Sequence, residues 1–173
     1  MKENVLDLLM YLFENYIYEE PESTPDRATL SRSLEEVGFS AREIERAFAW
    51  LDELAEQRQV AIMNRPKEDT PASMPAFPTT RVPKSCRIFN AEELQRLDVD
   101  ARGLLLYLEN VGVLDPISRE LVIDRLMALD ADEVAMEEVK WVVLMVLFNQ
   151  PGQEANYAWM EDLMFDEEGD YRH

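Results

Sequence analysis

The chain has 173 residues, of which 47% are apolar, and its 36 acidic and 17 basic side chains give a net charge of −19. A chain of this length buries about two-thirds of its unfolded surface, so it can fold as one or two domains without a disulfide or a metal. The acidic excess opposes general nucleic-acid binding and docking on anionic lipid, and it favours basic partners.

The single cysteine and the single histidine argue against the common catalytic and metal chemistries. Cys86 and His173 cannot by themselves supply a tetrahedral zinc site, and a Ser–His or Cys–His nucleophile would need the terminal histidine. The five glycines are isolated and form no phosphate-binding loop. We therefore expect no enzyme, and no catalytic, cofactor-binding or metal-binding residues. A carboxylate–metal site is the less favoured alternative, because no acidic run completes a calcium-loop pattern.

The composition also predicts a cytoplasmic protein. A lone cysteine fits a reducing compartment. Asp7 and Glu14 interrupt the apolar stretch near the N-terminus, which is unlike a signal peptide. The longest apolar run, 141–148, is far shorter than the roughly 20 residues of a membrane-spanning helix.

Residues 1–57 are predicted to form an N-terminal three-helix unit. Apolar residues at three- and four-residue spacings indicate helices at 3–18, 27–37 and 41–57. Asp26 is a candidate N-cap and Gly38 a candidate C-terminal glycine for the second helix, and Ser40 with Glu43 forms a capping box for the third. The spacing resembles a helix–turn–helix, but the third helix is net acidic, which is the wrong sign for DNA recognition.

Trp50 lies off the main apolar stripe of this third helix. Exposed tryptophans are favoured anchors of protein interfaces, so Trp50 is a candidate partner-binding residue. The alternative is that Trp50 packs between the two halves of the chain, because large aromatic side chains are mostly buried.

Residues 58–86 are predicted to be a flexible linker. The segment contains five of the nine prolines, shows no helical or alternating period, and carries a net charge of +3. Arg81 and Lys84, together with the following Arg87, are its candidate contacts to nucleic acid.

Residues 87–165 are predicted to form a larger C-terminal helical bundle, followed by an acidic tail at 166–173. The expected helices are 91–97, 101–111, 116–129, 136–149 and 153–165. Their expected caps are Asn90 with Glu93, Asp100, and Asp115 before Pro116, with Gly112 ending the second. Segment 136–149 is apolar on nearly all sides, which indicates a central core helix, with a buried strand as the alternative.

The charge is concentrated in this second half, which has a net charge of −13 against −6 for residues 1–86. Arg102, Arg119 and Arg125 are its main cations. They are expected to pair with nearby acids such as Glu109 and Glu120, or else to contact a partner. Trp159, near the C-terminus, is a further candidate interface anchor.

Several blocks of the chain resemble the bacterial Smg family. They include VLDLLMYLFENYI, GFSAREIERAFAWLDEL, RIFNAEELQRLDVDARGLLLYLENVGVLDP, SRELVIDRLMALD and KWVVLMVLFNQPG, in order along nearly the whole chain. The resemblance implies a bacterial cytoplasmic protein and assigns no reaction, ligand or residue role. Genes of this family tend to lie near genes for topoisomerase and DNA-processing functions.

The sequence therefore favours an all-α, non-enzymatic interaction or regulatory protein that binds a basic protein partner. The alternative is an accessory factor of nucleic-acid machinery that contacts a DNA-processing enzyme or the ribosome. In that alternative, Arg81, Lys84 and Arg87 would contact nucleic acid while the acidic helices face protein.

Overall fold

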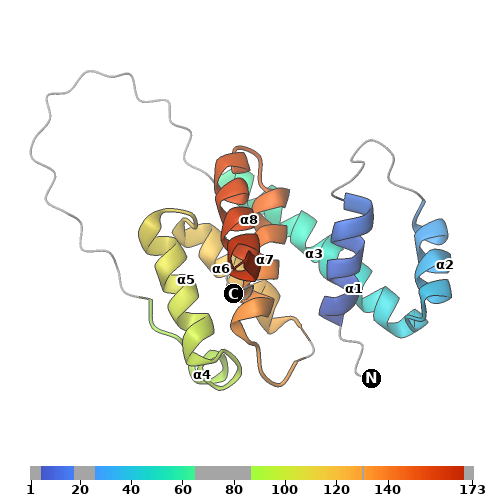
Figure 1. The fold of residues 1–173 in the computed structure, drawn as a ribbon, viewed down its shortest axis with the longest axis horizontal. Coiled ribbons are helices and arrows are strands. Elements are labelled where there is room, and N and C mark those ends of the chain that lie inside the picture. The colour runs from blue at the N-terminus through green and yellow to red at the C-terminus, as the bar shows by residue number, and fades with distance from the viewer. Residues whose placement is uncertain (1–4, 18–25, 65–86, 130, 170–173) are drawn as a thin grey trace, which may run out of the picture.

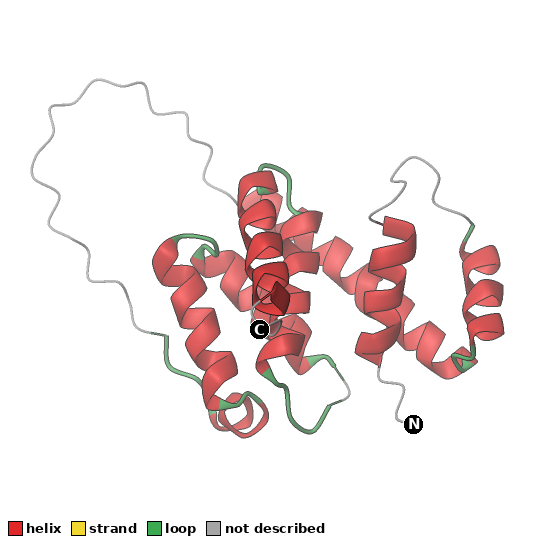
Figure 2. Ribbon diagram, viewed as in Figure 1, coloured by secondary structure: helices red, strands yellow, loops and turns green. Residues whose placement is uncertain are grey.

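The structure is a computed structural model that describes residues 5–17, 26–64, 87–129 and 131–169. Every named element in these ranges is helical, as Figures 1 and 2 show. In chain order they are α1 (Val5–Leu12), the π-helical turn η1 (Phe13–Ile17), α2 (Arg27–Val37), α3 (Ala41–Asn64), α4 (Ala91–Arg96), α5 (Val99–Val111), α6 (Pro116–Met127), α7 (Met136–Asn149) and α8 (Glu154–Gly169). The predicted all-α class is confirmed, and segment 136–149 is a helix rather than the alternative strand.

Most of the predicted helix ends are present with the expected chemistry. The carboxylate of Glu43 accepts from the Ser40 N–H at 2.9 Å, and that of Glu93 accepts from the Asn90 N–H at 2.9 Å. Gly38 ends α2 with a φ of +118°, a left-handed conformation that only glycine adopts without strain. The local sequence was sufficient to predict these helix ends because the two partners of a cap lie within one turn of each other.

Of two other predicted N-caps, one is at the expected position and one was wrong. Asp26 is the N-cap residue of α2, as predicted, but its side chain makes no capping hydrogen bond. α5 begins at Val99, and its cap is Asp98, which accepts from the Ala101 N–H at 2.6 Å; Asp100 lies inside the first turn. An aspartate is favourable both as the cap and in the first turn, so the pair 98 and 100 is ambiguous in sequence.

α7 is the centre of the C-terminal bundle. It packs against α3, α5, α6 and α8, and its residues from Val142 to Leu147 are all buried. Because neighbours cover several sides, an apolar surface all round the helix is stable there. No helix in the described part of the chain is long and apolar enough to cross a membrane.

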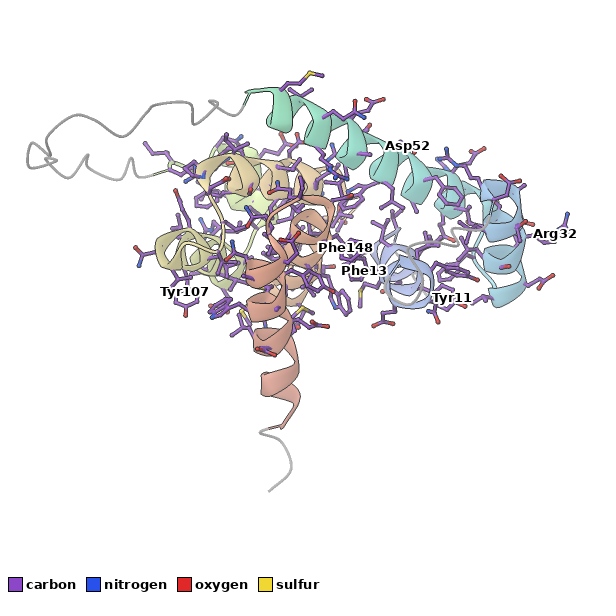
Figure 3. The ribbon with its side chains drawn as sticks, turned by 90° about the horizontal axis from the view of Figure 1, so that it is seen from above. Tyr11, Phe13, Arg32, Asp52, Tyr107 and Phe148 are labelled. Atoms are coloured by element: carbon purple, nitrogen blue, oxygen red, sulfur yellow. The ribbon has the colours of Figure 1, made fainter. Side chains whose placement is uncertain are left out.

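α3 connects the N-terminal helices to the C-terminal bundle (Figure 1). It packs against α1 and α2 and also against α6 and α7, and it continues to Asn64, seven residues beyond the end predicted at 57. η1 adds a second link, since Phe13 lies 5.3 Å from Phe148 and 6.5 Å from Trp141 between ring centroids (Figure 3). The buried apolar residues consequently form one cluster from Val5 to Met160.

The remaining predicted boundaries are only partly described. Residues 58–64 of the predicted linker are helical, whereas 65–86 lie outside the described residues. α8 extends to Gly169, so the first four residues of the predicted tail are helical, and 170–173 are not described. The division into units 1–57, 58–86 and 87–165 remains a prediction.

Candidate interaction surface

Several residues singled out in the sequence cannot be placed. Arg81, Lys84, Cys86 and His173 lie outside the described residues. Within the described ranges, no three side chains of the types that bind metals come together as a potential site.

Arg87 lies at the start of the C-terminal half, and two carboxylates bind its guanidinium. Arg87 donates from Nη1 and Nη2 to Glu93 on α4 at 2.8 Å each, and from Nε to Glu120 on α6 at 2.6 Å. Glu120 also accepts from Arg119 at 2.8 Å, and Arg119 donates from Nη1 to Glu109 on α5 at 2.5 Å. These five side chains form a continuous network that joins α4, α5 and α6.

The network stabilises the charged form of its members. Hydrogen bonds from Arg87 lower the pKa of Glu93 and of Glu120. Burial alone would lower the pKa of Arg119, but its hydrogen bonds to Glu109 and Glu120 raise it on balance. A general acid or base needs a pKa near the working pH, so shifts in these directions favour a structural role for the network.

Two of the candidate partner-binding cations are therefore engaged within the fold. The side chains of Arg87 and Arg119 are 12% and 9% exposed. For Arg119, the expected pairing with Glu109 and Glu120 is present. Arg102 is partly buried, and its Nε donates to the Asp98 carbonyl at 3.2 Å. Contact of any of these with a partner remains a prediction.

Trp50 is 3% exposed and lies where α3 meets α6. Its Nε1 donates to the Arg125 carbonyl at 2.9 Å. The Arg125 guanidinium donates to Glu53 at 2.7 Å and to Asp124 at 2.8 Å, and Gln57 donates to the same Asp124 at 2.8 Å. Trp50 is thus not an exposed anchor, because the side of α3 outside its main apolar stripe is covered by the second half of the chain.

The fold also buries or partly buries two further cations that were not predicted as site residues from the sequence. Arg96 on α4 caps the end of α6 by donating to three carbonyls, at 2.5 to 3.0 Å: those of Met127, Leu129 and Ala131. Lys140 on α7 is 2% exposed and pairs with Glu137 at 3.1 Å. A lysine beside an apolar run is a local signal that could have identified Lys140, whereas the partners of Arg96 lie more than 30 residues away.

The outcome is a charge separation between the inside and the outside of the C-terminal half. All six of its described cations are buried or partly buried: Arg87, Arg96, Arg102, Arg119, Arg125 and Lys140. Nine acids in the same part of the chain are exposed: Glu92, Asp100, Glu120, Asp124, Asp132, Glu133, Glu137, Glu154 and Asp162. Among the described residues of this half, the exposed charged side chains are therefore all acidic, which the net charge of −13 alone does not indicate.

Trp159 is the candidate anchor that the structure leaves accessible. It is 38% exposed on α8, and its ring lies 6.4 Å from that of Tyr107 on α5, which is 48% exposed. In Figure 3, Tyr107 lies on the lower side of α5, and α8 extends downward from the bundle on the same side. An exposed aromatic pair therefore lies within the acidic half.

Comparisons with known proteins place the chain in a family. The family model described as "Protein of unknown function (DUF494)" matches residues 5–173. The chain is 52% identical to "Protein Smg homolog" of Nitrosococcus oceani and 50% identical to that of Thioalkalivibrio sulfidiphilus, each over 100% of both chains. It is 52% identical to the protein of that name from Halorhodospira halophila over 96% of both chains. No solved structure matches. The chain belongs to the DUF494 family of bacterial Smg homologues, as the resemblance in its sequence implied.

Proposed function

We propose that this protein is a non-enzymatic, cytoplasmic interaction factor that binds a basic protein partner through the acidic surface of its C-terminal half. One observation carries the proposal: the described cations of this half are turned into the fold, while nine of its acids are exposed. An approaching lysine or arginine therefore meets carboxylates, with no fully exposed cation beside them among the described residues of this half. Such complementarity speeds association and selects against acidic competitors.

The pairing of the buried charges supports a binding role over a catalytic one. Arg87, Arg119 and Arg125 each contact two carboxylates, and Arg96 contacts three carbonyls. Side chains fixed in this way hold helices in place. Exposed acids outside these pairs, such as Glu92, Asp132 and Glu133, can by contrast bind a partner at little cost to the fold.

The proposal is tested by neutralising exposed acids in each half. The C-terminal variant converts to amides five exposed acids that make no hydrogen bond or ion pair within the described residues: Glu92, Asp100, Asp132, Glu133 and Asp162. The matched control does the same to five N-terminal acids: Asp26, Glu35, Glu36, Glu45 and Glu56. Both variants have the same net charge, so they differ only in where the charge is removed.

The readout is affinity purification from cell lysate at low and high salt, with quantification of each captured protein by mass spectrometry. We expect basic proteins to be captured at low salt, and their recovery to fall about tenfold in the C-terminal variant but little in the control. Equal losses in the two variants, or capture that is indifferent to salt, would contradict the proposal.

A further inference from the structure

The exposed face of α5 carries several large apolar side chains, with Asp100 and Asn110 as its exposed polar residues. Val99, Leu106 and Tyr107 are 73%, 37% and 48% exposed. At helical spacing they surround Gly103, on the side opposite the buried residues of this helix, which are Ala101, Leu105 and Leu108. Trp159 on α8 extends the patch through its contact with Tyr107. We call these five residues, Val99, Gly103, Leu106, Tyr107 and Trp159, the α5–α8 surface.

Gly103 has no structural explanation within the described chain. It lies inside α5 with a helical backbone, and a Cβ added there would meet nothing within 4 Å. A glycine inside a helix is less stable than an alanine, and here no turn, positive φ or close neighbour requires it. A missing side chain at the centre of an exposed apolar face does allow the backbone of another molecule to approach closely.

The charges around this surface indicate what kind of molecule approaches it. α8 contains six acidic residues and no basic one. Asp100 lies one turn from Gly103, and Asp162 lies one turn from Trp159; both are exposed. Arg102, the one cation of α5, points its Nε at the Asp98 carbonyl of its own helix. The apolar face is therefore bordered by carboxylates on both helices.

We propose that the α5–α8 surface binds a basic amphipathic helix of the partner protein. The apolar stripe of that helix crosses α5 at Gly103 and packs against Tyr107 and Trp159, and its lysines or arginines reach Asp100 and Asp162. A second copy of this chain would instead bring two acidic halves together. The proposal rests on the proposed function and specifies the site within the acidic half.

The probe is a synthetic, fluorescently labelled 18-residue peptide of leucine and lysine, with leucines spaced to form one apolar helical face. A control peptide has the same composition with its leucines distributed around the helix. Binding to the full chain is measured by fluorescence anisotropy. The test variants are Trp159→Ala and Gly103→Leu, and their matched controls are Ile88→Ala and Ala55→Leu, which alter exposed residues outside the surface.

We expect the amphipathic peptide to bind more tightly than the control peptide. We expect Trp159→Ala and Gly103→Leu each to raise its Kd about tenfold or more, while the two control variants change it less than about twofold. Gly103→Ala separates binding from folding: it should raise Tm by about 2–4 °C, since alanine is the better helix former, yet weaken peptide binding.

Other outcomes overturn the inference. Equal binding of the two peptides, with no effect of Trp159→Ala, would mean that charge alone attracts the peptide; the proposed function could then stand while this site fails. A dimer of the wild-type chain in light scattering that Gly103→Leu abolishes would assign the surface to self-association. The absence of salt-dependent partner capture by the wild-type chain in the lysate experiment is a separate result, and it would remove the proposed function itself.

Discussion

At the scale of single residues, Glu93 serves two parts of the fold. Its carboxylate accepts from the Asn90 N–H at the start of α4 and also binds Arg87. The first contact spans three residues and follows from the capping-box pattern. The second contact places Arg87 against both α4 and α6, because Arg87 also binds Glu120. Removal of the Glu93 charge should therefore keep the cap of α4 intact and weaken the contact that Arg87 makes between α4 and α6.

Glu93→Gln tests this, because an amide oxygen can still accept from Asn90. We expect a loss of about 3 kcal/mol in the free energy of unfolding at pH 7, since Arg87 loses a partner in a largely buried pair. In the folded wild type, the pKa of Glu93 lies below the ordinary value of 4.5. The unfolded chain therefore binds more protons near pH 4, and this stabilisation is present above pH 4.5 and is lost as the pH falls.

The measurement is urea unfolding from pH 7 to pH 3. The Glu93→Gln variant should show a shallower decline in stability than the wild type across the acid range. Glu138→Gln is the matched control, because Glu138 caps α7 by accepting from the Ala135 N–H at 2.7 Å, and no ion pair of Glu138 occurs within the described residues. Equal losses in the two variants would show that the Arg87 contact adds no stability.

At the scale of elements, the start of α5 shows that a local sequence pattern can be compatible with two different N-cap residues. Asp98 and Asp100 are both acceptable near a helix N-terminus, one as the cap and the other in the first turn. The choice depends on where the preceding helix ends. α4 is followed by Leu97, which is buried and pairs with Val134 in an isolated bridge. This bridge fixes Leu97 and leaves Asp98 at the capping position.

Single alanine substitutions distinguish the two aspartates. Asp98→Ala should lower the free energy of unfolding by about 1 kcal/mol, because the Ala101 N–H loses its acceptor. Asp100→Ala should change it by less than about 0.5 kcal/mol, because only a favourable charge near the helix dipole is lost. Thermal unfolding by circular dichroism measures both, and a larger loss for Asp100→Ala would contradict the assigned cap.

At the scale of the whole molecule, α3 determines how the two halves act together. Trp50, Glu53 and Gln57 on α3 all bond to residues of α6, and the apolar core is continuous across the contact. Burial of a tryptophan at such a contact contributes several kcal/mol to stability. We therefore expect the described helices to unfold in one cooperative transition.

Trp50→Ala tests this cooperativity. The substitution should cost about 3–5 kcal/mol through lost burial and the lost bond to the Arg125 carbonyl, and it should broaden or split the calorimetric transition. Trp159→Ala removes the same kind of side chain from an exposed position and should leave a single transition with little change in Tm. Two separate transitions already present in the wild type would contradict the cooperative coupling.

The sequence by itself determined the helical class, most helix positions, the Ser40–Glu43 and Asn90–Glu93 caps and the family. These features depend on periodicity and on contacts within about one turn of helix. Only the tertiary structure decided that Trp50 is buried, that Arg87 joins two carboxylates 6 and 33 residues away, and that Arg96 caps α6. Such contacts depend on how helices pack, and a count of charges cannot show which ones face inward. The acidic excess visible in the composition became a defined surface only when the fold turned the cations of the C-terminal half toward its interior.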